Sequence, residues 1–405
     1  MQTLLLSIAL LQPLLQPLPQ GAVPPAAVMR SSPEVDQIRL TVGLYRTEDT
    51  NPNVQQSPNQ LGTAIGLAPF VFDATTIAVP LLARTSWCDV DLSGLDARTY
   101  LDGRETRLDP ATVFHRLPGG VETLLRFGIS GGQRGVNEIR TQATFLVQRW
   151  EVDVDEGRAA ASTWPRSWPA WTERYLGREL GIDPTDPGIR SVAEQATPGG
   201  PRSVSPYVAA RNAVLAIVGR WKALSGGSSE HNVDGTLRGI AFTNGPSGLA
   251  AGRGTQVELA VTCVAALRSI GIPARVVYCI HQDGGGTRNR PICKFRYVGE
   301  FFLDGIGWIP FDPAQIRASG GATRGRGGAV KGFANVDDLE ELLPLAFRPV
   351  PEGFAQADRM AVWGWEPGRV QVESDLASSR ILFEDSSRGN GKIPSMPAPI
   401  SDESP

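Results

Sequence analysis

The stretch GRGTQVELAVTCVAALRSIGIPAR, residues 252–275, decides the fold of the chain that contains it. Thr255 and Glu258 have the spacing of a capping box, in which a threonine caps a helix and a glutamate reaches back to the cap. Apolar residues follow at helical spacing and cover most of the circumference, which predicts a buried helix. The glycine and proline of GIP end the pattern, so the sequence predicts a helix over residues 256–270 and then a strand.

The segments around this helix predict an α+β domain over residues 206–375. YVAARNAVLAIVGRWKAL has a helical period, and the strands ARVVYCI, ICKFRYVGEFFL and the short GWIPFDP follow the central helix. DDLEELLPL predicts a short acidic helix, and RMAVWGWEPGRVQVES predicts a final hairpin. We therefore expect a helix packed on an antiparallel sheet.

The N-terminal part of the chain has a different pattern. Residues 35–155 contain the alternating segments QIRLTVGLY, TIAVPLL, TLLRFGI and TQATFLVQRWEVDV, which turn clusters separate. Short alternating strands without helices between them predict an antiparallel β-sandwich. Residues 156–205 form a linker region in which we expect three tryptophans, Trp164, Trp168 and Trp171, to seal a contact between the two domains.

Composition and charge exclude several classes of function. The net charge of -3 among 405 residues gives no reason to expect nucleic acid as a partner. The four cysteines match no zinc spacing, and we expect no metal and no cofactor. Cys279 and Cys293 lie on successive predicted strands, where they either form a disulfide or remain buried thiols.

The two ends of the chain predict export and a polar tail. Residues 1–28 have a short apolar run, residues 4–11, and then a proline-rich stretch with small residues, which is typical of a secretory signal peptide. We therefore expect an extracytoplasmic or secreted protein. No later segment is long and apolar enough to predict a membrane span. Residues 385–405 are expected to be a disordered tail.

Two motifs resemble the transglutaminase-like superfamily, which has a papain-like fold. The quoted stretch resembles that family's glycine-rich lead, cysteine-bearing helix start and Gly-Ile-Pro-Ala-Arg sequence. RYVGEFFLDGIGWIPFDP, residues 296–313, resembles its His-x-Trp-x-Glu strand, turn, Gly-Trp pair and aspartate before proline. The resemblance covers roughly residues 205–315.

The resemblance implies a Cys–His–Asp triad for acyl transfer, amide hydrolysis or peptide cleavage, but two of its three residues are changed here. The cysteine position is Gln256, the histidine position is Arg296, and the aspartate position is Asp312. The strand glutamate is kept as Glu300, whereas the strand tryptophan is Val298. A glutamine forms no thiolate, and a guanidinium stays protonated and cannot act as a base. Arg296 is expected to pair with Asp312, bidentately if the geometry allows.

Three functions follow as hypotheses. The first is a catalytically inactive transglutaminase-like protein that binds a peptide, protein or cell-envelope ligand through Gln256, Arg296, Asp312 and Glu300. The second is an active cysteine-type amidase, protease or transglutaminase with its nucleophile elsewhere, for which Cys263 is the residue to consider. The third is an extracytoplasmic scaffold that acts through other surfaces. Each site residue also has a simpler interpretation: an exposed first-turn glutamine, an arginine on a solvated strand face, or an Asp-Pro turn.

Overall fold

The computed structural model gives the positions of most of the chain. It describes residues 27–46, 70–106, 115–116, 122–130, 135–224, 229–232, 236–242, 245–283, 292–321, 329–349, 353–356, 360–367, 369–370 and 377–385. The expected signal peptide and the expected disordered tail lie almost wholly outside these residues. Among the helices of the described residues, none is long and apolar enough to cross a membrane.

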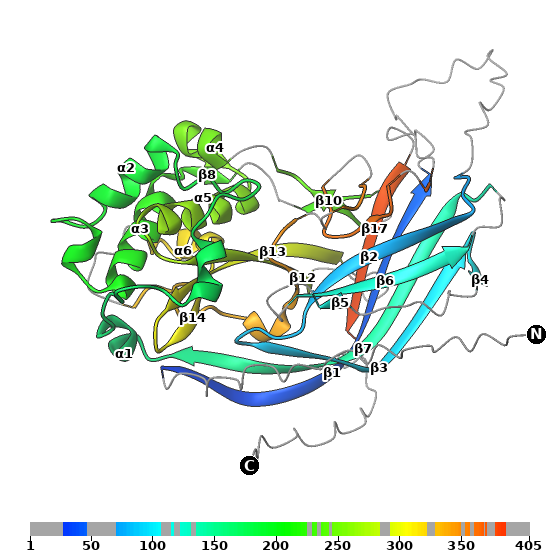
Figure 1. Cartoon of the computed structure of the whole chain (residues 1–405), viewed down its shortest axis with the longest axis horizontal. Helices are drawn as coiled ribbons and strands as arrows, with labels where there is room; N and C mark the ends of the chain where they lie inside the picture. The colour runs from blue at the N-terminus through cyan, green and yellow to red at the C-terminus, as the bar shows by residue number, and fades with distance from the viewer. Residues whose placement is uncertain are drawn as a thin grey trace, which may run out of the picture.

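A seven-stranded antiparallel sheet forms one side of the molecule (Figure 1). Its strands, in spatial order, are β4 (Arg104–Thr106), β3 (Cys88–Leu101), β7 (Glu138–Val154), β1 (Val28–Arg46), β17 (Ala377–Asp385), β10 (Leu237–Ile240) and β9 (Ser229–His231). Along β7, buried and partly exposed residues alternate, as they do in a sheet with one face turned to a core. The strand segments expected within residues 35–155 are confirmed, and β3, β4 and β5 (His115–Arg116), which is in the smaller sheet, are additional strands.

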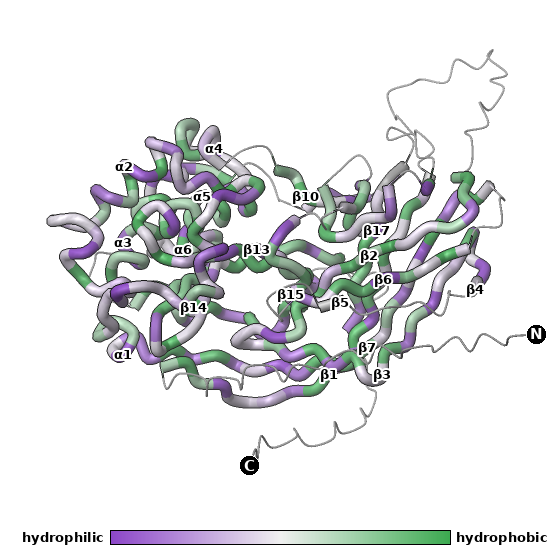
Figure 2. Tube along the Cα trace, viewed as in Figure 1, coloured by the Kyte–Doolittle hydropathy of each residue, from purple (hydrophilic) through white to green (hydrophobic). Residues whose placement is uncertain are grey.

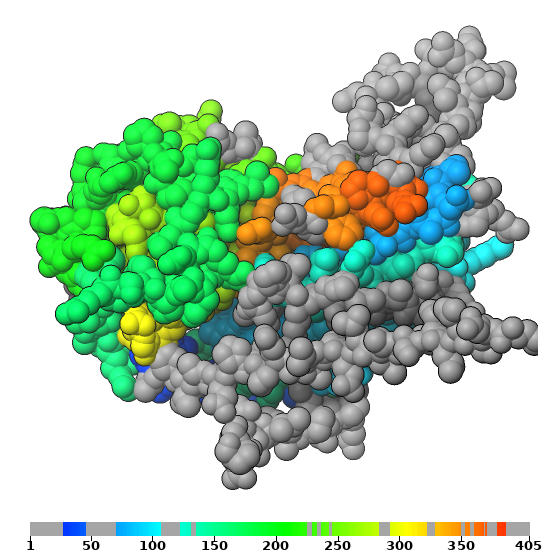
Figure 3. All heavy atoms as spheres, in the orientation of Figure 1, coloured from blue at the N-terminus to red at the C-terminus, as the bar shows by residue number. Residues whose placement is uncertain are grey.

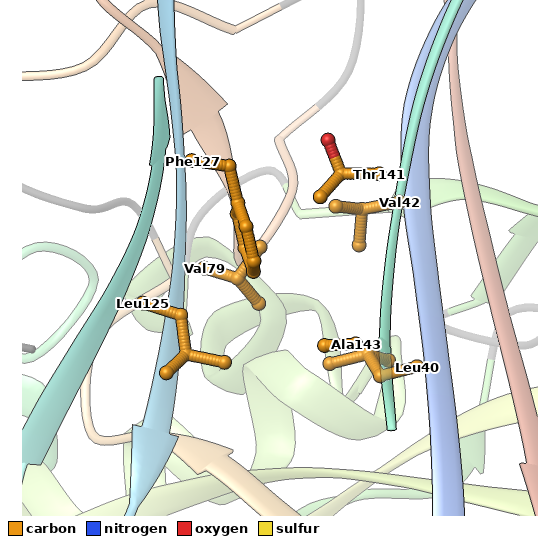
Figure 4. Close-up of a pocket in the computed structure, with 7 residues that line it drawn as sticks. All are labelled: Leu40, Val42, Val79, Leu125, Phe127, Thr141 and Ala143. Atoms are coloured by element: carbon orange, nitrogen blue, oxygen red, sulfur yellow. The ribbon is translucent and has the colours of Figure 1, made fainter. Parts of the chain in front are cut away.

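A smaller antiparallel sheet faces the first. It contains β16 (Gly364–Trp365), β2 (Ala74–Leu82), β6 (Glu122–Ser130) and β5 (His115–Arg116), in that spatial order. Figure 4 shows apolar side chains of the two sheets pointing toward one another. The larger sheet contributes Leu40, Val42, Thr141 and Ala143, and the smaller contributes Val79, Leu125 and Phe127. The gap between them has no room for a water molecule, so it is part of a packed core.

Both sheets contain strands from distant parts of the sequence. β17 pairs with β1 over nine residues, and β10 and β9 continue the large sheet beyond β17. The small sheet takes β16 from the same late part of the chain. The expected boundaries between residues 35–155 and 206–375 therefore remain predictions, since hydrogen bonds join strands from both sides of them.

The other side of the molecule is a third antiparallel sheet with helices packed on it (Figure 1). The sheet has the order β14 (Gly307–Phe311), β13 (Ile292–Leu303), β12 (Ala274–Asp283), β15 (Leu343–Ala346). The helices and short pairs are α1 (Glu156–Ala160), η1 (Ala170–Tyr175), α2 (Pro187–Gln195), η2 (Pro201–Ser203), α3 (Pro206–Arg220), β8 (Ala223–Leu224), α4 (Gly245–Ala251), β11 (Arg253–Gly254), α5 (Gln256–Ser269), α6 (Pro313–Ala318) and η3 (Leu339–Glu341). Hydrophobic residues run through both parts of the molecule (Figure 2).

Helix α5 is the centre of this part, and the predicted helix over residues 256–270 is confirmed. Both halves of the capping box are present: the Thr255 hydroxyl accepts from the Glu258 amide, and the Glu258 carboxylate accepts from the Thr255 amide. Gly271 follows with a positive φ of 82°, which a glycine adopts at little cost. Nearly all of α5 is buried, so its amino end has a fixed position in the fold.

One prediction for the late part of the chain is wrong. Residues 337–345 do not form a helix: a 3-10 turn, η3, leads directly into strand β15. Leu343 and Leu345 are fully buried there, and β15 pairs with β12, so pairing at the sheet edge overrides the acidic helix pattern. The expected final hairpin, residues 359–374, lies partly outside the described residues; within them, β16 pairs with β2.

The cysteines are free and buried, and the disulfide alternative for Cys279 and Cys293 is wrong. In the register of β12 with β13, Cys279 lies opposite Arg296 and Cys293 lies opposite Gln282. The Cys293 sulfur instead contacts the main chain of Phe383 in β17 at 3.2 Å. The two thiols are therefore several residue pairs apart along the ladder.

Two of the three linker tryptophans, Trp168 and Trp171, cover the third sheet, and Trp164 contacts Trp168. Trp168 and Trp171 pack edge-on against Phe302, with ring centroids 6.2 and 5.0 Å away, and Trp171 also contacts Trp308 of β14. The indole of Trp168 donates a hydrogen bond to the carbonyl oxygen of Gly271, just after α5. The residues after α1 thus lie over the β13–β14 turn, on the face that Figure 3 presents.

Candidate functional site at the amino end of helix α5

Gln256 is the first residue of α5 and is partly exposed. The first turn of a helix has free amide groups and the positive end of the helix dipole, so this position favours a negative charge or an acceptor. The Thr255 cap satisfies one of these amides. α5 packs against β13 and α6, which carry the other two positions of the triad motif.

Arg296 and Asp312 form an ion pair at the edge of the interior. The Nε atom of Arg296 lies 2.7 Å from Oδ2 of Asp312, and their side chains are 16% and 4% exposed. The expected pairing is present, but it is not bidentate: Nη2 of Arg296 donates instead to the carbonyl oxygen of Asp337 at 2.9 Å. Within the described chain, no hydrogen bond joins the Gln256 amide group to this pair.

Asp312 also caps helix α6. Its Oδ1 atom accepts from the amides of Ala314 at 2.8 Å and Gln315 at 3.0 Å. Both carboxylate oxygens are therefore occupied, one by the guanidinium and one by a helix start. Asp312 is therefore both the Asp-Pro turn residue and the ion-pair partner that the sequence analysis considered. The capping geometry directs its Oδ2 atom toward Arg296.

Gln315 and Asp337 join the site, and the sequence analysis missed both. The Gln315 side-chain oxygen accepts from the main-chain amide of Asp337 at 3.1 Å. Asp312-Pro-Ala-Gln315 has the spacing of a capping box, which is a signal for the start of α6. The Asp312 amide donates to the Gly332 carbonyl oxygen rather than to Gln315, so the glutamine is left to bind Asp337.

Glu300 is buried and pairs with a different residue from Arg296 and Asp312. It has no exposed surface, and one carboxylate oxygen lies 2.7 Å from Nε of Arg275. The Arg275 guanidinium lies 3.8 Å above the ring centroid of Trp308 and 3.9 Å from that of Phe347, which are cation–π distances. Glu300 thus holds the third sheet to its neighbours, and we do not carry it into the proposed ligand site.

The native thiols are poor nucleophiles in this fold. Burial raises the pKa of Cys88 to about 12 and that of Cys293 to about 11. Burial likewise raises the pKa of Cys263 and of Cys279 far above the usual range of a thiol. Because the thiolate is the reactive form, none of the four is activated near neutral pH. Cys263, the alternative nucleophile of the sequence analysis, lies fully buried in α5.

The histidines are placed elsewhere. His231, at the edge of the large sheet, has a ring nitrogen 2.8 Å from the carbonyl oxygen of Cys293. His115 is in β5 of the small sheet, and His281 is in β12 opposite Lys294. Within the described ranges, no three His, Cys, Asp or Glu side chains form a group that could hold a metal ion.

Comparison with known families agrees with this geometry. Residues 243–313 match the family model of the transglutaminase-like superfamily, so this part of the chain is transglutaminase-like. The matched range contains the amino end of α5, Arg296 and Asp312. No curated protein matches the chain in sequence.

Three solved structures are similar to this chain, and one of them, with a TM-score of 0.50, shows a similar overall fold. A proposed cysteine protease from Cytophaga hutchinsonii is 13% identical, with a TM-score of 0.50 over 88% of this chain and 92% of that one. The periplasmic domain of TgpA from Pseudomonas aeruginosa is 15% identical, with a TM-score of 0.28 over 60% of this chain and 90% of that one. A proposed protease from Parabacteroides distasonis is 12% identical, with a TM-score of 0.23 over 70% and 59%. At these identities the likeness concerns the fold.

Proposed function

We propose that this chain is a catalytically inactive transglutaminase-like protein that binds a peptide, protein or cell-envelope ligand outside the cytoplasm. The observation that carries the proposal is the Arg296–Asp312 ion pair at the positions of the family's histidine and aspartate. A guanidinium held there by a carboxylate has no proton-accepting form, so it binds and orients but does not catalyse. Export rests on the leader of residues 1–28.

The site supplies groups that bind a main chain or a carboxylate. The guanidinium is a planar donor with several N–H groups, of which Asp312 and Asp337 take two. Gln256 adds an amide that donates and accepts at the positive end of the α5 dipole. These donors suit the carbonyl groups of an extended peptide or the carboxylate of a peptide stem.

Loss of catalysis is tested with transferase and hydrolase probes. The protein is incubated with an amine donor, a glutamine-containing acceptor peptide and a fluorogenic amide, with and without iodoacetamide. We expect no turnover in either condition, because the four thiols are buried and unactivated. Turnover that iodoacetamide abolishes would establish the alternative, an active cysteine enzyme with another nucleophile.

Binding is tested by substitution of Arg296. A library of synthetic peptides and soluble peptidoglycan fragments is screened for binding to the wild-type protein, and the hits are measured against Arg296→Ala. We expect affinity to fall by at least about tenfold, as for loss of a charge-assisted hydrogen bond. Arg190→Ala, which removes an exposed arginine from α2, is the matched control. Equal affinity in both variants would favour the scaffold hypothesis, with binding through another surface.

A further inference from the structure

Residues 334–338, which we call the strap, lie against the candidate site between two buried anchors. Phe333 on one side and Leu339 on the other are each about 1% exposed. The Ala334 amide donates to the carbonyl oxygen of Pro310 at 3.0 Å, which joins the start of the strap to strand β14. Ala334 and Val336 are buried with the anchors, whereas Asp337 is partly exposed and Asp338 is exposed, so these last two residues are the part of the strap that is able to move.

The main chain of Asp337 is bound on both sides by the site. Its carbonyl oxygen accepts from Nη2 of Arg296 at 2.9 Å, and its amide donates to the Gln315 side chain at 3.1 Å. Two side chains thus bind the C=O and the N–H of a single residue. Sites that recognise extended peptides bind main-chain groups in this way and leave the side chain to pockets. The Asp337 carboxylate itself points to Lys331, in an ion pair whose side chains are 59% and 44% exposed.

The strap is held in a strained conformation. Ala334 has a φ of 65° and Asp338 a φ of 58°, and both carry a Cβ that disfavours the left-handed region. Such residues persist only where the surrounding contacts hold them, and they gather at ligand clamps and switches. The contacts here include the site residues, the Ala334 bond, the burial of Ala334 and Val336, and two bonds between Asn335 and Val154: the Val154 amide donates to Oδ1 at 2.8 Å, and Nδ2 donates to the Val154 carbonyl oxygen at 3.5 Å.

We propose that the strap is an internal ligand of the site, and that an external peptide competes with it. The main chain of Asp337 occupies the place that a peptide carbonyl and amide take on Arg296 and Gln315. Release of the strap relieves the strained residues and frees both side chains. This inference rests on the proposed function, which it deepens by naming the ligand class, an extended peptide main chain, and the contact that regulates access.

Hydrogen exchange of the wild-type protein gives the first test. The Asp337 amide is expected to exchange by local opening, at least about a hundredfold faster than the amides inside α5. Exchange of Asp337 at the same rate as the α5 core would show that the strap opens only when the protein unfolds, and would overturn the proposal. This measurement needs no substitution and no ligand.

Binding in trans gives the second test. Asn335→Ala removes the acceptor for Val154 and Lys331→Ala removes the exposed ion pair, and neither residue belongs to the proposed receptor. This double variant is expected to bind a synthetic peptide of residues 333–339, FANVDDL, at least about tenfold more tightly than the wild type, because the internal competitor is weakened. Arg296→Lys in the same background should abolish the gain.

The controls separate this proposal from the proposed function. Arg190→Ala, which removes an exposed arginine of α2, should bind the peptide as the wild type does, and a scrambled peptide should not bind. If the double variant folds but does not bind the peptide, the internal-ligand proposal is refuted. The proposed function is tested separately, by comparing Arg296→Ala with the wild type for binding of external ligands. If the double variant does not fold, the exchange rate of Asp337 in the wild-type protein decides.

Discussion

A thiol placed at position 256 would report the electrostatics of the amino end of α5. Gln256→Cys restores the residue of the family motif on a partly exposed first turn. The background is suitable, because the four native cysteines are buried and their pKa values are raised. The new thiol is then the one that reacts with a soluble alkylating reagent in the native state.

Two electrostatic effects set the expected pKa of the thiol at position 256. An ordinary thiol has a pKa of about 8.5. The first turn of a helix stabilises an anion by ~0.3–1 kcal/mol, which lowers the pKa by about 0.2–0.7 units. A nearby cation lowers the pKa of a thiol by ~1–3 units. Because Asp312 offsets most of the Arg296 charge, we expect Arg296 to lower the pKa of this thiol by about 1 unit. The expected pKa of the introduced thiol is therefore about 7.

The assay is the rate of iodoacetamide alkylation against pH, followed by mass spectrometry of the peptide that contains residue 256. Gln256→Cys combined with Arg296→Met should raise the thiol pKa by about 1 unit, because the cation is lost. Ser269→Cys, at the opposite end of the same helix, is the matched control and should have a pKa of about 8.5 or above. The assignment of Arg296 to the site would be refuted if the thiol at position 256 had an ordinary pKa and Arg296→Met did not change it.

Three further predictions follow from contacts away from Gln256. Ala334→Gly relieves a left-handed alanine and should stabilise the protein by about 0.5–1 kcal/mol in urea unfolding; a loss of stability would show that the Ala334 methyl group matters more than its backbone strain. Glu300→Gln leaves the buried Arg275 without its anion and should cost ~3–5 kcal/mol, against about 0.5 kcal/mol for the exposed Glu194→Gln; equal effects on the unfolding midpoint would contradict the buried pair. Ellman's reagent should titrate no thiol of the native wild-type protein and four thiols in denaturant; a thiol that reacts in the native state would contradict the burial.

The sequence predicted the parts of the structure whose signals are local. The capping box and the GIP stop defined α5 to within a residue, because both act through hydrogen bonds and backbone geometry inside the segment. The pairing of Arg296 with Asp312 was expected from the resemblance to the transglutaminase-like superfamily, and the structure contains it.

The parts that failed depend on distant partners. The strap could not be predicted, because Ala334 takes its left-handed conformation against the residues that surround it, and no local pattern favours it. Residues 337–345 had an acidic helical pattern, but the open edge of β12 turned their second half into a strand. Gln315 carried the cap signal of α6, yet its real partner, Asp337, is 22 residues away.

The place of β17 has a consequence for how the chain reaches its native state. β17 is the last of the described strands along the sequence, yet it lies inside the seven-stranded sheet, between β1 and β10 (Figure 1). A chain that emerges amino end first from a ribosome or a translocon therefore waits with the edge of β1 unpaired until residue 385 has appeared. Exposed edges of this kind recruit other strands. A chaperone that binds the growing chain would therefore matter most before residue 385 is synthesised. Premature termination would leave an aggregation-prone product rather than a shortened domain.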